Sequence, residues 1–271
     1  MRDEWIVPDW PAPATVRAVG TTRLGGVSTG VYASLNLGLH VGDAADSVAE
    51  NRRRLCAVLD LHKQPHWLKQ THSAHVATIG HLKNPLSPVA VGEMGRVRGS
   101  AQATQAGNLE ATAADAAITQ STDEVCAIMT ADCLPVLFCD RTGHTVAAAH
   151  AGWRGLVAGI LEAAIAAMQT SPEEILAWLG PAIGPEAYEV GDEVRTALVR
   201  AQADAEQAFE PAHPGKWMCD LYLIASQRLR RAGIHRIYGG GFCTYTDRER
   251  FFSYRRDGEC GRMASLIWLA S

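Results

Sequence analysis

The feature that most constrains the fold is a set of closely spaced apolar runs near the middle of the chain. Between residues 114 and 151 the sequence contains the runs ADAAIT, VCAIMTA, LPVLFC and TVAAAH. Strands that are apolar on both faces are covered on both faces by other layers of a protein. This segment therefore predicts buried strands at the centre of a layered domain.

Helical and strand patterns flank these runs. Apolar spacing predicts helices over 44–59, 156–168, 192–203 and 221–231, and further strands over 66–70, 75–79, 175–179, 234–238 and 263–269. Hairpins interrupt the alternation of strands and helices, which argues against a doubly wound Rossmann sheet. We expect one α/β domain over 1–271, with mixed β-sheets layered with helices. Residues 81–108, rich in Pro, Gly and small polar side chains, are predicted to form a flexible insertion.

Composition argues against several classes of function. A net charge of −4 and a sequence pI of about 6.2 give no basic surface for nucleic acid. The opening MRDEWIVPDWP does not resemble a secretory peptide, and no apolar run is long enough to span a membrane. Seven cysteines without a CxxC pair argue against a disulfide framework or a four-cysteine zinc module. We expect a cytoplasmic protein with no nucleic-acid or membrane partner; the oligomeric state is left open.

A cysteine and a histidine lie at the two ends of one predicted hairpin. The intervening DRTG is typical of a type I turn. With the first and last residues of DRTG paired, Cys133 falls directly opposite His150, with Cβ atoms roughly 5 Å apart. A thiolate and an imidazole at that separation can share one metal ion, or can act as a nucleophile and its base. Alternatively, two polar strand-end residues simply meet there, and a bulge at Pro135 would change the pairing.

A catalytic zinc site needs three protein ligands and an open position. His72 and His75, in the segment KQTHSAHV, lie where predicted strands end or begin. Their spacing places them on opposite sides of a straight strand, so we expect only one of them to be a ligand. The spacing does not select between them.

Longer motifs between residues 21 and 269 resemble one protein family. They are SLNLGLHVGD, NRRRL, TADCLPVLF, HAGWRG, GPAIGPEAYEVG and FFSYRRDG. Together they are similar to the laccase-domain or purine nucleoside phosphorylase-like family, also called peptidoglycan editing factor and, by an older name, multicopper polyphenol oxidase. The resemblance implies a zinc ion held by His72, Cys133 and His150, and so selects His72 over His75. The chain departs from the family pattern at Cys260 in DGECGR, where family members usually have Thr.

The resemblance also implies an activity. It implies phosphorolysis of adenosine, inosine and methylthioadenosine to the free base and ribose 1-phosphate, together with adenosine deamination, so the expected partners are a nucleoside and phosphate. Zinc, favoured over copper, would lower the pKa of bound water and supply the hydroxide for deamination. Cys133 and His150 would be catalytic as well as ligands. Asp132 is the first candidate for proton transfer, although it could equally be a hydrogen-bond partner of the turn or of a ligand.

Phosphorolysis requires an anion site. The segment HAGWRG leads into the helix predicted at 156–168, so its backbone N–H groups and Arg154 are candidates for binding phosphate. In the alternative interpretation, Arg154 pairs with a carboxylate. Arg255 is a candidate for stacking on a purine or holding a phosphate, unless its segment is a half-buried strand with charged flanks. Asn36, in a Gly-rich loop, is a further candidate for substrate binding.

Three other functions are open at this point. A cysteine hydrolase that removes an amino acid from a peptidoglycan precursor would use Cys133 as nucleophile and His150 as base. Multicopper oxidation requires many histidines, and the chain has no HxH pair. A purely structural zinc site would need a fourth ligand, such as His75 or Cys243.

Overall fold

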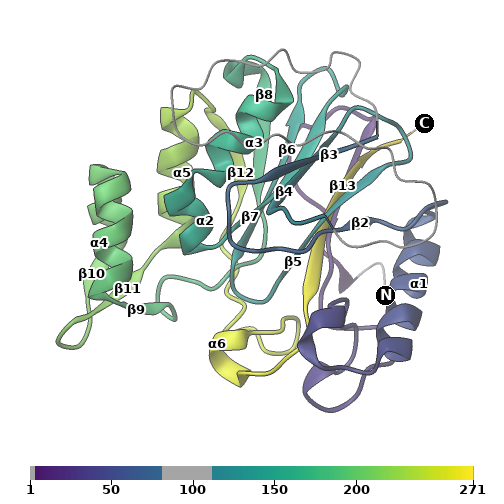
Figure 1. Ribbon diagram of the computed structural model, residues 1–271, viewed down its shortest axis with the longest axis horizontal. Coiled ribbons are helices and arrows are strands. Elements are labelled where there is room, and N and C mark those ends of the chain that lie inside the picture. Colours follow the sequence, from purple (N-terminus) through teal and green to yellow (C-terminus); the bar gives the residue numbers. More distant parts are fainter. Residues whose placement is uncertain (1–3, 81–111, 271) are drawn as a thin grey trace.

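Strands from distant parts of the chain form two large sheets that face each other. The computed structural model describes residues 4–80 and 112–270 (Figure 1). The strands are β1 (Val16–Gly20), β2 (His66–Trp67), β3 (Val76–Ile79), β4 (Ala116–Thr119), β5 (Val125–Thr130), β6 (Leu134–Asp140), β7 (Val146–Ala151), β8 (Ile175–Leu179), β9 (Glu189–Gly191), β10 (Phe209–Pro211), β11 (Lys216–Cys219), β12 (Arg236–Gly239) and β13 (Met263–Leu269). The insertion predicted at 81–108 lies outside the described residues.

The two large sheets are both mixed. One has the order β12-β8-β6-β7-β4-β3, and the other has the order β1-β13-β5-β2. Each contains antiparallel pairs and at least one parallel pair. A small antiparallel sheet, β10-β11-β9, lies apart from them. The predicted mixed-sheet α/β fold is confirmed.

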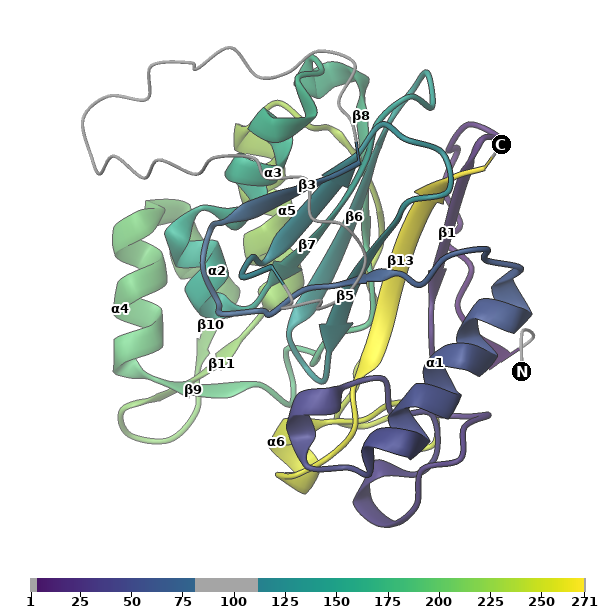
Figure 2. The same ribbon diagram turned by 45° about the vertical axis from the view of Figure 1, so that its right-hand side comes forward.

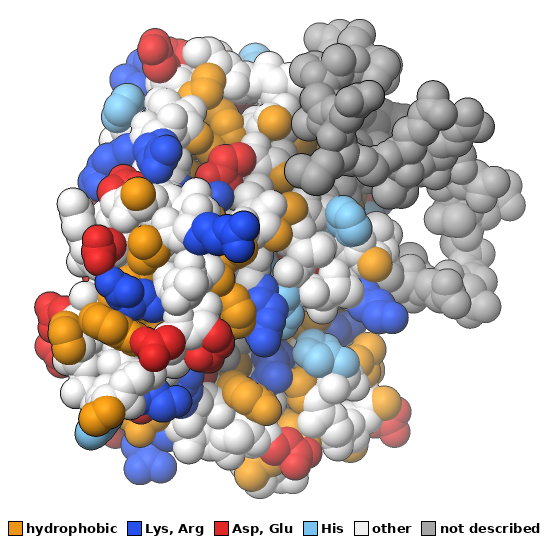
Figure 3. Space-filling model, turned by 60° about the vertical axis from the view of Figure 1, so that its left-hand side comes forward, with side chains coloured by type: hydrophobic (Ala, Val, Ile, Leu, Met, Phe, Trp, Pro, Cys, Tyr) orange, Lys and Arg blue, Asp and Glu red, His pale blue; other side chains and the backbone are white. Residues whose placement is uncertain are grey.

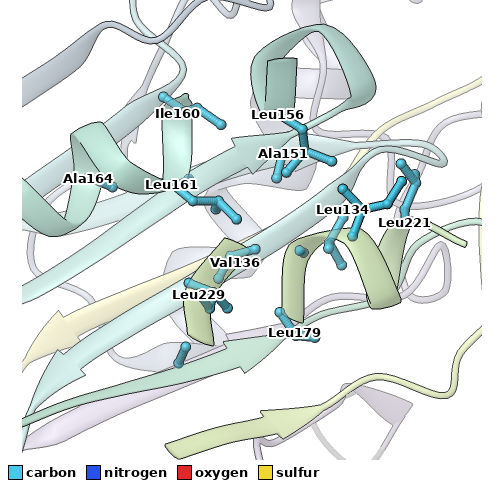
Figure 4. Packing of buried hydrophobic residues seen from close by; sticks show 14 of the residues in the cluster. Leu134, Val136, Ala151, Leu156, Ile160, Leu161, Ala164, Leu179, Leu221 and Leu229 are labelled. Carbon is cyan, nitrogen blue, oxygen red and sulfur yellow. The ribbon is translucent and has the colours of Figure 1, made fainter. Parts of the chain in front are cut away.

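Helices cover the outer faces of both large sheets (Figure 2). The helices are α1 (Ala45–Leu59), α2 (Trp153–Ala158), α3 (Ile160–Met168), α4 (Asp192–Ala201), α5 (Leu221–Arg231) and α6 (Tyr254–Asp257). Leu55 and Leu59 of α1 pack against the four-stranded sheet. Figure 4 shows residues of α2, α3 and α5 packed on the six-stranded sheet, with Leu161 and Leu229 near Val136. None of the helices in these described ranges has both the length and the apolar character needed to cross a membrane.

Strand β6 shows why the central runs are apolar throughout. Val136 and Phe138 contribute to the core under the helices, whereas Leu137 and Cys139 contribute to the core between the two sheets. Successive residues of a strand point to opposite faces, so a strand between two layers needs apolar residues at every position. This arrangement explains why the apolar runs in the sequence correspond to strands that are covered on both faces.

Several elements differ from the prediction. The helix predicted over 156–168 begins earlier, at Trp153, and is divided into α2 and α3 at Gly159, whose φ of +86° is left-handed. Glycine adopts that conformation without the steric cost that other residues incur. The prediction also missed β1 and the small sheet. In contrast, β8, β13 and α5 have the predicted bounds.

The predicted hairpin register is wrong by two residues. The expected turn forms, since the Gly143 N–H donates to the Asp140 carbonyl over 3.1 Å. However, the Asp140 N–H pairs with the Thr145 carbonyl, and the Asp140 carboxylate accepts the N–H groups of His144 and Thr145. The loop is therefore longer than the turn alone, and Pro135, not Cys133, pairs with His150.

Candidate metal centre

Three side chains from separate parts of the chain converge at one end of the central strands of the six-stranded sheet. His150 lies near the end of β7, Cys133 directly precedes β6, and His72 lies in the loop between β2 and β3. The ligand atoms of the three residues all lie within 4.8 Å of one another, and the imidazole centroids of His72 and His150 are 4.8 Å apart. The corrected register makes Cys133 a diagonal neighbour of His150. That position still allows their side chains to meet, because they share a sheet face.

Gly152 makes room for this convergence. If the β6–β7 register is continued past the end of the ladder, Gly152 is the residue opposite Cys133. A Cβ atom at Gly152 would lie 2.8 Å from Cys133 Sγ and 3.4 Å from His72 Cδ2. Any larger residue at this position would displace the thiol, so the sulfur depends on a glycine beside it.

Asp115 is a functional residue that sequence reasoning missed. It is fully buried at the start of β4, and its Oδ1 lies 2.9 Å from His150 Nδ1. A carboxylate on one imidazole nitrogen fixes the ring so that the other nitrogen can bind a metal. An acid inside the otherwise apolar run ADAAIT was the signal that could have identified it.

Asp115 also shapes the loop that carries His72. Its carboxylate accepts the backbone N–H groups of Thr71, His72 and Ser73 over 3.1, 2.9 and 2.6 Å. His72 has a φ of +59°, which is left-handed and uncommon for a residue with a Cβ. The three hydrogen bonds hold this backbone conformation, so one buried carboxylate organises both histidines.

The charges around His72, Cys133 and His150 favour the thiolate form of Cys133. Burial raises the pKa of the Cys133 thiol, but the charge of His150 and hydrogen bonds with both histidines outweigh burial and lower it below its usual value. Burial lowers the pKa of His150, whereas Cys133 and Asp115 together raise it above its usual value. Burial likewise opposes ionisation of Asp115, but hydrogen bonds from His150 and Ser73 keep its pKa low. A thiolate is the form of cysteine that binds metal.

The donor set fits a divalent metal ion with one open position. Tetrahedral zinc with Zn–N and Zn–S bonds near 2.1 and 2.3 Å places its ligand atoms about 3.6 Å apart, so the three side chains need only a small closure. Within residues 4–80 and 112–270, the group consists of these three ligands, and neither His75 nor Cys243 belongs to it. Three protein ligands are typical of catalytic zinc sites, whereas structural sites usually have four.

Asp132 lies beside the triad but is already engaged. Its Oδ1 accepts the Thr244 hydroxyl over 2.7 Å, and its Oδ2 accepts the Arg255 N–H over 2.7 Å. The side chain is buried and the backbone φ is +98°. These contacts favour the alternative in which Asp132 holds the turn that carries Cys133, rather than transferring protons.

The three predicted substrate-binding residues have different surroundings. The Arg154 guanidinium is exposed and lies 4.4 Å from the centroid of the Trp153 ring, with no ion pair among the described residues. Arg255 Nη1 donates to the Glu189 carbonyl over 2.6 Å. Asn36 is fully buried, and its side-chain oxygen accepts the N–H groups of Gly38 and Arg262. Asn36 therefore shapes a loop and has no exposed surface for a ligand.

Comparisons with known proteins agree over nearly the whole chain. The chain is 50% identical over 264 residues to purine nucleoside phosphorylase YfiH of Escherichia coli (strain K12), covering 97% of this chain and 98% of that protein. The crystal structure of Neisseria meningitidis protein NMB0706 has a TM-score of 0.85 and 45% identity, covering 99% of this chain and all of that one. The structure of YlmD from Geobacillus stearothermophilus has a TM-score of 0.82 and 31% identity, covering 98% and 96% of the two chains. The family model described as multi-copper polyphenol oxidoreductase laccase matches residues 17–270, and the chain belongs to this family.

Proposed function

We propose that this protein is a zinc-dependent purine nucleoside phosphorylase that also deaminates adenosine. The substrates would be adenosine, inosine and methylthioadenosine. Phosphorolysis would split the first two into the free base and ribose 1-phosphate, and methylthioadenosine into adenine and 5-methylthioribose 1-phosphate. The observation that carries the proposal is the convergence of three ligand side chains, His72, Cys133 and His150. Three protein ligands would leave a tetrahedral zinc ion one position for water or substrate. Relatives of similar length named purine nucleoside phosphorylase support the class of reaction.

The residues of the chain would prepare the site in defined ways. When bound, zinc supplies a Lewis acid at the open position. Asp115 keeps the His150 ring oriented by accepting from its Nδ1, which leaves Nε2 directed at the metal position. Asp132 fixes the turn before β6, so the Cys133 sulfur stays next to both imidazoles.

The test combines metal analysis with product identification. We expect purified protein to contain zinc, and Cys133→Ala to lose both the zinc and the turnover of adenosine. Cys56→Ala, which changes a half-buried thiol on α1, is the matched control and should retain both. Adenine formed only in the presence of phosphate identifies phosphorolysis, whereas inosine identifies deamination. Unchanged phosphorolysis by a folded, metal-free Cys133→Ala protein would exclude the proposed role of zinc.

One observation favours a second candidate function. Cys133, His150 and Asp115 form a Cys-His-Asp arrangement, in which the carboxylate orients the base of a nucleophilic thiol. The candidate is a cysteine hydrolase that removes an amino acid from a peptidoglycan precursor. It predicts that metal-free protein cleaves an amide and that alkylation of Cys133 abolishes this cleavage. Activity that requires zinc argues against it, because the metal occupies the thiolate.

The donor set gives little support to multicopper oxidation. In the part of the chain that the structure describes, only one group of three histidine and cysteine ligands comes together. A copper polyphenol oxidase needs further histidine sites, so we place this function below the other two.

A further inference from the structure

Phosphorolysis consumes a phosphate dianion, and the segment expected to bind it is poorly suited to do so. Helix α2 contains only the six residues from Trp153 to Ala158, which makes a short and weak dipole. The Arg154 guanidinium at its start is exposed and lies over a tryptophan ring. A different group of basic side chains on the same side of the protein has the features of an anion site.

Arg52, Arg262 and His40 gather around Gly38. A Cβ atom at Gly38 would lie 2.9 Å from Arg262 Cγ and 3.4 Å from His40 Cε1, so the arginine stem and the imidazole pack directly over the bare backbone. Arg52 reaches the same loop from α1, where its Nε and Nη2 donate to the Leu37 carbonyl over 3.0 and 2.8 Å. Three basic side chains from separate parts of the chain therefore surround one glycine.

No acidic side chain neutralises this group among the described residues. Arg52 and Arg262 form no ion pair there, although the neighbouring Arg53 and Arg54 both pair with Glu50. In the adjacent C-terminal segment, Arg250 pairs with Asp247 and Arg256 pairs with Asp257. Arg52 and Arg262 therefore lie together with no ion-paired carboxylate among the described residues.

The electrostatic surroundings disfavour the charged forms of Arg52 and His40. Burial lowers the pKa of Arg52 to about 10. Burial, followed by the charges of Arg262 and Arg52, lowers the pKa of His40 below its usual value. Two guanidinium groups held together with no ion-paired carboxylate among the described residues create a positive potential that attracts an anion. Arg guanidinium groups suit phosphate because they donate two parallel hydrogen bonds.

The cluster lies at the same edge of the sheets as the metal centre. Arg52 Nη2 is 4.0 Å from Met129 Sδ, and the backbone of Met129 is bonded to the side chain of Gln70, two residues before His72. Met263, which follows Arg262, pairs with Thr130 at the end of β5, and the next strand begins directly after Cys133. Figure 3 shows Lys or Arg side chains beside His side chains on one face of the molecule.

We propose that Arg52, Arg262 and His40 form the binding site for the phosphate dianion. Its role as the site of a co-substrate rests on the proposed phosphorolysis, whereas its ability to bind inorganic phosphate does not. Tyr254 is exposed next to the site, with its ring centroid 5.9 Å from the Arg262 guanidinium carbon. An exposed aromatic ring beside an anion site suits a nucleoside that approaches the bound phosphate.

The test measures binding of inorganic phosphate to the full-length, metal-containing protein by titration calorimetry. We expect Arg262→Gln and Arg52→Gln each to weaken phosphate binding about tenfold or more, because each removes a positively charged guanidinium group from the site. Arg262→Lys should restore part of the affinity. Arg53→Gln is the matched control, since it removes one exposed positive charge from the same helix and should leave phosphate binding unchanged.

The outcomes separate this site from the proposed function. Equal phosphate affinity in the wild-type protein and in folded Arg262→Gln and Arg52→Gln variants overturns the site, even if the wild-type protein phosphorolyses purine nucleosides. Loss of phosphate binding in both variants supports the site. It does so even if no nucleoside is converted, and in that case only the proposed function fails. Arg52 also bonds to the chain, so thermal melting should confirm that each variant is folded.

Discussion

At the residue scale, the metal centre depends on two residues that are not metal ligands, Asp115 and Gly152. Asp115 provides a buried carboxylate that orients His150 and holds the left-handed backbone of His72. Gly152 has no side chain, and this leaves space for the Cys133 sulfur next to it. The geometry of the ligands is therefore set by residues around them, as is common for metal sites.

Gly152→Ala tests this dependence. The φ of Gly152 is −67°, which alanine adopts readily, so the only added cost is the contact of its Cβ with Cys133 Sγ. We expect zinc affinity to fall by about 10- to 100-fold while the protein remains folded. Chelator competition measures the affinity, and circular dichroism measures the fold.

Gly20→Ala is the matched control for that substitution. Its new Cβ would have no neighbour nearer than 3.5 Å, which is an ordinary van der Waals contact. Zinc affinity should therefore be unchanged in this variant. An equal affinity in the Gly152→Ala protein would show that the sulfur does not need the space that glycine provides.

At the scale of elements, the β6–β7 hairpin shows how one side chain sets a register. The Asp140 carboxylate accepts the N–H groups of His144 and Thr145 over 2.8 and 2.7 Å, and so ties down the two residues that follow the turn. These two residues lengthen the loop. Each residue of β6 therefore pairs two positions further along β7 than it would if residues 140 and 143 closed the turn. The shift moves Cys133 from a direct to a diagonal position with respect to His150.

Asp140→Ala should destabilise the protein by about 1–3 kcal/mol, because the buried N–H of Thr145 loses its charged acceptor. Urea denaturation measures the free energy of unfolding. Arg141→Ala, which removes an exposed ion pair with Glu174, should cost less than about 1 kcal/mol. Similar losses in the two variants would contradict the role of Asp140 in the loop.

At the scale of the whole molecule, the two large sheets lie face to face between two helical layers. The core between the sheets draws residues from both, including Leu137 of β6 and Ile128 of β5. The metal centre and the proposed anion site lie where strands of the two sheets end, and one strand, β7, contributes the ligand His150.

Leu137→Ala should lower the free energy of unfolding by about 2–5 kcal/mol, since it leaves a cavity between the two sheets. The folded variant should retain the zinc stoichiometry of the wild-type protein. Val7→Ala, at a position that is 69% exposed, should change stability by less than about 0.5 kcal/mol. A loss near zero for Leu137→Ala would indicate that the sheets do not pack as described.

The sequence by itself determined the features that depend on local pattern. Continuous apolar runs identified strands covered on both faces, and apolar spacing identified α1 and α5, because burial imposes a repeat that is visible within one segment. Cys133 and His150 were identified as partners from their positions in one hairpin, and similarity to a known family selected His72.

Only the tertiary structure decided the features that depend on which groups each polar side chain contacts. It set the hairpin register through Asp140, identified Asp115 as the residue that organises both histidines, and brought Arg52 and Arg262 together around Gly38. Asp115 and His150, like Arg52 and Arg262, are far apart in the sequence, whereas Asp140 binds backbone N–H groups four and five residues later. A carboxylate or a guanidinium acquires its role from the charges and backbone groups that folding places around it, and these cannot be read from its own segment.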